Sequence, residues 1–339
     1  GHHALVNSRA LEIAGIEDAV TDPVGGRFVR DAAGRPTGLL LDSAQQAVMA
    51  SPIDVGNHGP STGIYEAPVE ELVTAIERAY REFLRAGITS AVDAQVTGRE
   101  LRAYIQARKQ GRLAVRTTCM MLSNHLEDFE RLGLSGPLGD DWLALGPMKL
   151  YSDGALSGST AVFTDAYQHE EGFHGVSYWA PEELTGLVGR AHRLGIQVGI
   201  HAQGDAGIRV AVDAIESALA DLPRDDHRHR IEHFGAPAPV EIERVARLGV
   251  IPVSNPRFVY EVGDTFWDNL GEERARRTYP LGTELRAGAH VVFGSDTPVS
   301  SFEPLGIIWA AMTRRTLGGR EMTAEDRLTV EQALRACTI

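Results

Sequence analysis

The chain has 339 residues, of which 43% are hydrophobic and 23% charged, a composition typical of soluble domains that excludes disorder and fibrous repeats. Its 33 Lys and Arg residues are outnumbered by 46 Asp and Glu residues, and the net charge of -13 argues against a nucleic acid partner, because phosphates are bound by cationic side chains. Two cysteines and no run of about 18 apolar residues exclude a disulfide framework and a membrane span. We therefore expect a small-molecule partner, no membrane contact and a cytoplasmic location, and a homo-oligomer is compatible with these features.

The first 67 residues lack the strand and helix pattern of the rest of the chain. Within them, FVRDAAGRPTGLLLD predicts a β-hairpin that turns at Ala33 and Gly34. We interpret residues 1–67 as an N-terminal segment whose hairpin is inserted near the mouth of a larger domain. Because the chain starts at Gly1 rather than Met and ends within an amphipathic pattern, we expect a fragment lacking both ends, with 317–339 as the start of a truncated C-terminal helical segment.

From residue 68 onwards, a helical pattern ends at a glycine and is followed directly by an apolar, β-branched run five times, and the strand candidates at 143–153 and 229–234 lack that glycine. The clearest helices are predicted at 68–86, 181–194 and 205–219, the last with Asp205 as its N-cap. Apolar runs predict seven strands, at residues 86–93, 110–122, 143–153, 194–205, 229–234, 248–255 and 287–296. Strands that are apolar throughout are typical of a parallel sheet whose faces are covered by helices.

This alternation of strand and helix predicts an α/β fold with a parallel sheet. Seven strands after an abrupt start favour a (β/α)8 TIM-type barrel over residues 68–316 that lacks its first strand. A doubly wound open sheet is the alternative. It is disfavoured because neither GxGxxG nor GxxxxGK[ST], the phosphate loops typical of such sheets, occurs in the chain.

Ionisable residues stand where apolar strands end, which is the position of catalytic groups in barrels of this type. They are Lys149, His201, His233 and Asp296. Each has a structural alternative: a lone histidine is often a satisfied core residue, Asp296 also fits a helix N-cap, and Lys149 can extend to solvent or pair with a carboxylate. Together, two imidazoles and a carboxylate are suitable ligands for Zn²⁺ or a similar divalent ion.

At these residues the sequence resembles the amidohydrolase superfamily, and within it the amidohydrolase-3 branch of N-substituted formamide deformylase-like hydrolases. The similarity is carried by GHHALVNSRALEIAGI at 1–16, PTGLLLD at 36–42, MKLYSDGALSGSTA at 148–161, HAQGDAGIRVAVDAIE at 201–216, RIEHF at 230–234 and GSDTPVSSFEPLGIIWAAMTR at 294–314. Barrels of this superfamily carry an HxH pair on strand one, a carboxylated lysine or a glutamate on strand four, histidines on strands five and six, and an aspartate on strand eight. The resemblance implies that Lys149, His201, His233 and Asp296 are metal ligands.

The resemblance is incomplete, because no HxH pair is found on a barrel strand and the small β-sandwich of the family is missing from the sequence. We therefore expect the parent protein to be the enzyme, and this chain to bind metal weakly or not at all. The implied activity is hydrolysis of a non-peptide carbon–nitrogen bond, in an N-formyl, N-acyl or cyclic amide, by water activated on one or two zinc ions with Asp296 as general base.

The resemblance also implies a carbamate on Lys149, formed from CO₂, and an unmodified Lys149, neutral or paired with Asp153, is the alternative. Candidate substrate contacts are His2, Asn7, Asp153, Asp205 and Trp309, although Asp205 is explained equally well as an N-cap and Trp309 as a core residue. We interpret the histidines in polar stretches as surface residues; these are His125, His169, His174, His227 and His229. The competing functions are a catalytically inactive barrel that acts as a scaffold or oligomer subunit, and an ester or phosphoester hydrolase.

Overall fold

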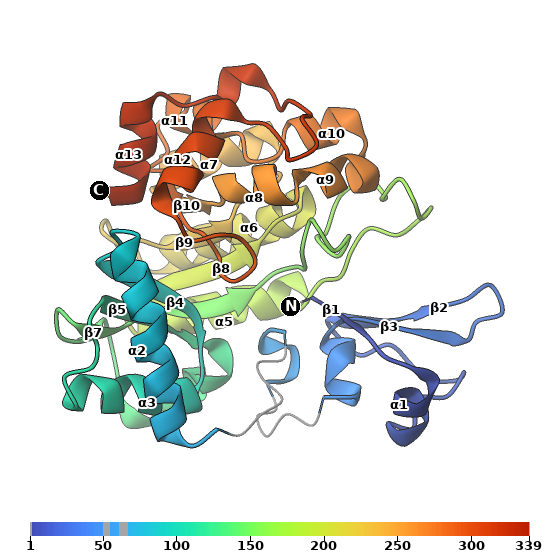
Figure 1. The fold of residues 1–339 in the computed structure, drawn as a ribbon, viewed down its shortest axis with the longest axis horizontal. Helices are drawn as coiled ribbons and strands as arrows, with labels where there is room; N and C mark the ends of the chain where they lie inside the picture. Colours follow the sequence, from blue (N-terminus) through green and yellow to red (C-terminus); the bar gives the residue numbers. More distant parts are fainter. Residues whose placement is uncertain (1, 50–54, 61–66, 339) are drawn as a thin grey trace.

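The computed structural model describes residues 2–49, 55–60 and 67–338. Its centre is a curled parallel sheet in the order β11-β10-β9-β8-β7-β5-β4 (Figure 1). The strands are β4 (Ser90–Val96), β5 (Arg116–Leu122), β7 (Leu143–Tyr151), β8 (Val198–Ala202), β9 (Arg230–His233), β10 (Ile251–Ser254) and β11 (Val292–Phe293), and the short β6 (Leu138–Gly139) pairs antiparallel with β7. The predicted α/β fold is confirmed, and each predicted strand overlaps one observed strand. Among the described residues β4 and β11 remain the two unjoined edges of the sheet, which is therefore an open half-barrel.

Helices surround this sheet (Figure 1). They are α2 (Val69–Arg85), α3 (Gly98–Lys109), α4 (Leu126–Leu132), α5 (Pro181–Arg193), α6 (Asp205–Asp221), α7 (Pro239–Leu248), α8 (Pro256–Glu261), α9 (Gly263–Leu270), α10 (Glu272–Arg276), α11 (Leu281–Arg286), α12 (Pro304–Thr313) and α13 (Val330–Thr338). Single 3-10 turns occur at η1 (Ser43–Ala47), η2 (Gly56–His58), η3 (Ser123–His125) and η4 (Ala324–Asp326). None of the helices in the described ranges has both the length and the apolarity needed to cross a bilayer.

The helix patterns in the sequence account for the buried faces. In α2 the first turn carries Glu70 and Glu71, which favour a helix N-terminus, and Val73 and Tyr80 point into the core. All five residues of β8 are buried, as expected for a central parallel strand. The predicted N-cap of α6 is wrong by one position: Gly204 is the N-cap, and Asp205 is the first helical residue, whose Oδ1 accepts a hydrogen bond from Thr164 N at 2.7 Å.

The N-terminal residues form a separate antiparallel sheet beside the barrel strands (Figure 1). Its order is β1-β3-β2, with strands β1 (His3–Leu5), β2 (Gly26–Arg30) and β3 (Pro36–Asp42), and α1 (Ser8–Ile13) follows β1. The predicted hairpin is confirmed: β2 pairs with β3, and the turn contains Gly34 at a φ of 82°, where glycine is favoured. The last residue of β3, Asp42, is completely buried.

The interpretation of two histidines as surface residues is wrong. His227 is 4% exposed and His229 is 0% exposed, and they form a cluster with the buried His192 of α5. His229 Nδ1 accepts a hydrogen bond from Val198 N at 3.0 Å, and the opposite nitrogen lies 2.8 Å from His192 Nδ1. Their hydrophilic neighbours in the sequence hid this burial, because the turn before β9 packs under α5 rather than facing solvent.

Candidate metal centre at the carboxyl ends of the strands

The four strand-end residues come from neighbouring parts of the sheet. Lys149 lies on β7, His201 on β8 and His233 at the end of β9, and Asp296 follows β11. The rings of His201 and His233 are 4.5 Å apart between centroids, and Lys149 Nζ lies 4.5 Å from the centre of the Tyr151 ring, which contacts His201 at 4.9 Å. The structure therefore brings Lys149 and both histidines together, and the charge of Asp296 acts on Lys149 and His233.

Each imidazole has one nitrogen held by a protein oxygen. His201 Nε2 donates to Gly154 O at 3.0 Å, and His233 Nδ1 donates to the Asn255 side-chain oxygen at 2.7 Å. Asn255 in turn donates through Nδ2 to Gly294 O at 2.8 Å, which connects β9 with the residue after β11. These bonds assign the proton of each ring, so His201 Nδ1 and His233 Nε2 carry the lone pairs. Histidines that ligate metals are commonly oriented in this way.

Burial keeps both rings neutral. It lowers the pKa of His201 well below its ordinary value, and a positive charge on His233, Lys149 or His2 lowers it further. Burial also lowers the pKa of His233, although the negative charge of Asp296 raises it in part. Neutral imidazole is the form that binds a metal ion, so the donor set fits a divalent cation. In the described part of the chain, however, no three His, Cys, Asp or Glu side chains are grouped closely enough to hold a metal by themselves.

Lys149 is the buried cation of this region. Its side chain does not extend to solvent, because the residue is 2% exposed, and burial lowers the pKa of its amine to about 8. The negative charge that raises its pKa most is that of Glu232, which is bound by Arg230 with 2.9 Å between Nη2 and Oε2. Although burial alone would raise the pKa of Glu232, Arg230 and Lys149 lower it, so this carboxylate stays charged. Glu232 was not recognised in the sequence.

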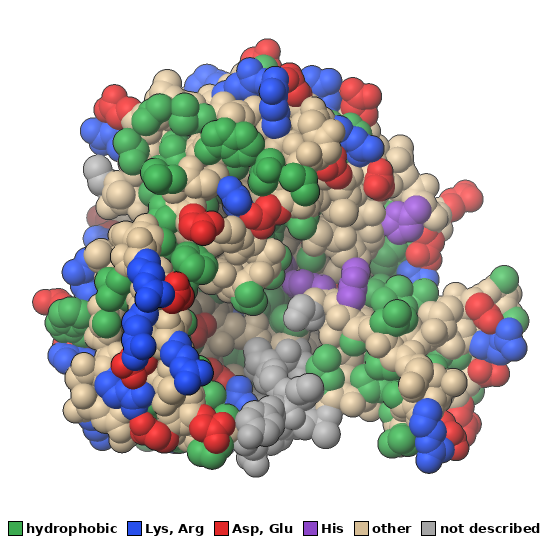
Figure 2. All heavy atoms as spheres, in the orientation of Figure 1, with side chains coloured by type: hydrophobic (Ala, Val, Ile, Leu, Met, Phe, Trp, Pro, Cys, Tyr) green, Lys and Arg blue, Asp and Glu red, His purple; other side chains and the backbone are tan. Residues whose placement is uncertain are grey.

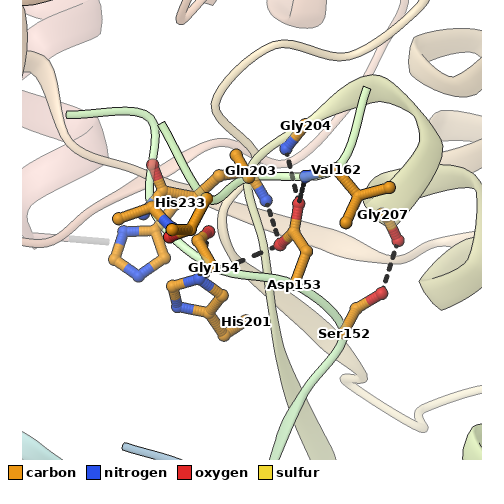
Figure 3. Close-up of polar contacts among 12 residues, drawn as sticks. Ser152, Asp153, Gly154, Val162, His201, Gln203, Gly204, Gly207 and His233 are labelled. Carbon is orange, nitrogen blue, oxygen red and sulfur yellow. Dashed lines mark hydrogen bonds and ion pairs between the residues drawn. The ribbon is translucent and has the colours of Figure 1, made fainter. Parts of the chain in front are cut away.

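The alternative pairing of Lys149 with Asp153 is wrong. Asp153 is completely buried, and its two oxygens accept backbone hydrogen bonds from Val162, Gln203 and Gly204 at 2.8 to 2.9 Å (Figure 3). Gly207 packs so closely that a Cβ there would lie 2.4 Å from Asp153 Oδ2. Burial raises the pKa of Asp153 to about 7. This carboxylate therefore joins the loop after β7 to the start of α6, beneath His201.

Not all of the predicted substrate contacts lie at the site. His2 lies at the site, with its ring 5.5 Å from that of His201. Asn7 instead caps α1, where its side-chain oxygen accepts from Ala10 N at 3.0 Å. Asp205 binds Thr164 N, as described above. Trp309 of α12 is not a core residue: it is 43% exposed, and its ring contacts Tyr260 at 4.9 Å.

Three residues around this site have backbone conformations that are rare for residues with a side chain. The φ angles are 71° for His233, 54° for Asp296 and 47° for Asp42. Such conformations are retained where the surrounding structure requires them, and they are frequent at functional sites. Figure 2 shows histidine side chains where the N-terminal sheet meets the rest of the molecule. Asn255 and Asp42 were missed in the sequence, although Asn255 directly follows β10 and the strand-end criterion would have identified it.

The whole chain, residues 1–339, matches the sequence model described as the amidohydrolase family. It is 31% identical to Protein LONG AFTER FAR-RED 3 of Arabidopsis thaliana over 93% of this chain and 54% of that protein, and 28% identical to N-substituted formamide deformylase of Arthrobacter pascens over 100% of this chain and 62% of the relative. A crystal structure of an uncharacterized metal-dependent hydrolase from Pyrococcus furiosus aligns with a TM-score of 0.74 and 26% identity, covering 98% of this chain and 64% of that one. The chain thus spans between about half and two thirds of each of these proteins. It belongs to the amidohydrolase family.

Proposed function

We propose that the protein is a metal-dependent hydrolase that cleaves a non-peptide carbon–nitrogen bond, in an N-formyl, N-acyl or cyclic amide. The observation that carries this proposal is the pair of buried, neutral imidazoles, His201 and His233, whose lone pairs are left free next to the buried Lys149. Membership of the amidohydrolase family supports the reaction class. The printed name of one relative, N-substituted formamide deformylase, suggests an N-substituted formamide as the first substrate to test.

In this proposal Lys149, His201, His233 and Asp296 hold one or two divalent ions, and the nitrogen and oxygen donors favour zinc. When bound, the ion supplies a Lewis acid that activates water and polarises the amide carbonyl. Asp296 takes the proton of the attacking water and returns it to the leaving nitrogen. The buried His201 and His233 stay neutral during this transfer, because burial disfavours their protonated forms.

Lys149 has two available states, and we favour the carbamate. Its amine, with a pKa of about 8, has a substantial neutral fraction near pH 8, and only a neutral amine attacks CO₂. The nitrogen forms a bond to carbon, the amine loses one proton, and the product is a carbamate anion able to bind metal. Native mass spectrometry in bicarbonate buffer with Zn²⁺ is expected to show one added CO₂ in the wild-type chain and none in Lys149→Met.

The reaction class is tested on the complete protein after loading with Zn²⁺, by measuring hydrolysis of a panel of amides and matched esters. We expect amide hydrolysis that is removed by a chelator and reduced at least 100-fold in His201→Ala and Asp296→Asn. His290→Ala is the control, because His290 is an exposed residue just before β11. Faster hydrolysis of the esters would instead favour the ester hydrolase, and zinc binding without any hydrolysis would favour the inactive scaffold.

A further inference from the structure

Asp42 is a buried carboxylate that the mechanism above does not use. It ends β3 of the N-terminal sheet, is 0% exposed and has a φ of 47° and a ψ of -123°, a combination that residues with a Cβ rarely adopt. Strain of this kind persists only where neighbouring contacts hold the residue in place. The contacts of Asp42 therefore show what its conformation achieves.

Asp42 binds two side chains through a single oxygen. Its Oδ1 accepts from His2 Nδ1 at 2.5 Å and from the Tyr178 hydroxyl at 3.0 Å. Its Oδ2 is buried and has no hydrogen-bond partner among the residues that the structure describes. Tyr178 stacks near Tyr151, with 5.3 Å between ring centroids, and Tyr151 contacts His201. Asp42 thus connects the N-terminal sheet to the carboxyl ends of β7 and β8.

The bond to Asp42 determines which nitrogen of His2 carries the proton. A carboxylate only accepts hydrogen bonds, so Nδ1 is the donor, and Nε2 of the neutral ring keeps its lone pair. No described residue makes a hydrogen bond to Nε2. The side chain of His2 is 20% exposed, and its ring lies 5.5 Å from that of His201. An acceptor nitrogen with a fixed orientation therefore stands next to the candidate metal centre and remains open to a ligand.

We propose that His2, oriented by Asp42, accepts a hydrogen bond from the N–H of the scissile amide through Nε2, and so selects secondary amides against N,N-disubstituted amides. This inference rests on the proposed amide hydrolysis and names the substrate class of that site. A site built to bind an N–H rejects a substrate without one, because the acceptor is then covered by the substrate and left unpaired. Asp42 is a positioning residue, and His2 is the residue that contacts substrate.

The tautomer of His2 is tested first, because that measurement does not depend on activity. In ¹⁵N-histidine-labelled protein at pH 8.5, where imidazoles are in general neutral, we expect Nδ1 of His2 to carry the proton and Nε2 to be unprotonated. His2→Gln assigns the signal by its disappearance. Asp42→Asn is expected to abolish the fixed preference, since a carboxamide both donates and accepts. A proton on Nε2 of the wild-type ring would overturn the proposal.

Selectivity is tested with N-cyclohexylformamide and N-cyclohexyl-N-methylformamide. We expect the wild type to prefer the first by at least tenfold in kcat/KM, and His2→Ala to reduce this ratio to about one by slowing only the first substrate. His2→Ala is preferred over Asp42 variants because it removes the proposed acceptor itself, in a side chain that is partly exposed, and keeps the fully buried Asp42. His290→Ala is expected to keep the wild-type ratio.

The outcomes separate this inference from the function on which it rests. Equal wild-type rates on both substrates, or a ratio that survives in His2→Ala, would overturn the inference while amide hydrolysis stands. Hydrolysis of neither substrate by the zinc-loaded protein would contradict the proposed function, and the tautomer of His2 would still decide whether the acceptor exists.

Discussion

At the scale of single residues, Lys149 is expected to reduce the stability of the fold. Burial lowers the pKa of its amine from 10.5 to about 8, which costs about 3 kcal/mol of folding free energy. The full cost applies below pH 8, where the amine is charged in both the folded and the unfolded chain, and it disappears above pH 10.5. We predict that Lys149→Met raises the free energy of unfolding in urea by about 1 to 3 kcal/mol at pH 7 without metal, with a gain that shrinks as the pH rises. A loss of stability would show instead that Lys149 is a structural partner of Glu232.

A second residue whose role can be tested is Asn255, which orients His233. Replacing Asn255 by Leu keeps the size of the side chain but leaves His233 Nδ1 without its acceptor, so the ring is free to rotate or to change tautomer. We expect zinc to bind about 10- to 100-fold more weakly, measured by calorimetry. Asn57→Leu is the matched control, because Asn57 bonds only to Tyr178 O among the described residues. Equal losses in both variants would indicate general damage rather than a role for Asn255.

At the scale of elements, the histidine cluster beneath β8 and β9 makes the packing of α5 sensitive to acid. Each ring bonds as a neutral Nε2–H tautomer: His227 donates to Leu248 O, His229 to His192, and His192 to Leu222 O. Burial lowers the pKa of His229 to about 2, and the groups that lower it further, His227, Arg224 and His192, are ones whose charged forms are cationic. Protonation of His229 therefore breaks the network, and none of the charges that act on this ring is negative.

The sign of the pH effect follows from the lowered pKa. The unfolded chain takes up a proton on His229 below about pH 6.5 while the folded chain does so only near pH 2, so stability falls with acidification across that window. We predict that His229 alone removes about 2 kcal/mol of unfolding free energy between pH 7 and pH 5. His229→Leu is less stable at pH 7 but has a shallower acid slope, measured by urea denaturation at several pH values. The exposed His290→Ala keeps the wild-type slope, and an unchanged slope in His229→Leu would refute the assignment.

At the scale of the whole molecule, periodic features were predictable and contacts between distant segments were not. The apolar runs located all seven barrel strands, and the rule that barrel chemistry lies at strand ends found Lys149, His201 and His233, which the fold brings together. The contact of His2 with Asp42 depends on how the N-terminal sheet lies against the barrel, which no local pattern encodes. The burial of His229 likewise depends on its contact with α5, and the polar sequence around this histidine gives no sign of that contact.

The candidate ligands extend along the chain from residue 149 to residue 296, and Lys149, His201 and His233 come together only in the folded state. An ion bound by them stabilises the folded state alone, so the gain follows mass action, at about 2.7 kcal/mol when free zinc is 100 times its dissociation constant. We expect the melting temperature to rise steadily with the logarithm of the Zn²⁺ concentration and to return to its starting value with a chelator. Lys149→Met distinguishes zinc binding from intrinsic stability, because the variant is expected to have a higher melting temperature without zinc and a smaller rise with zinc. If Lys149→Met and His233→Ala respond to zinc as strongly as the wild type does, the ion binds elsewhere and these residues come together for a reason other than metal binding.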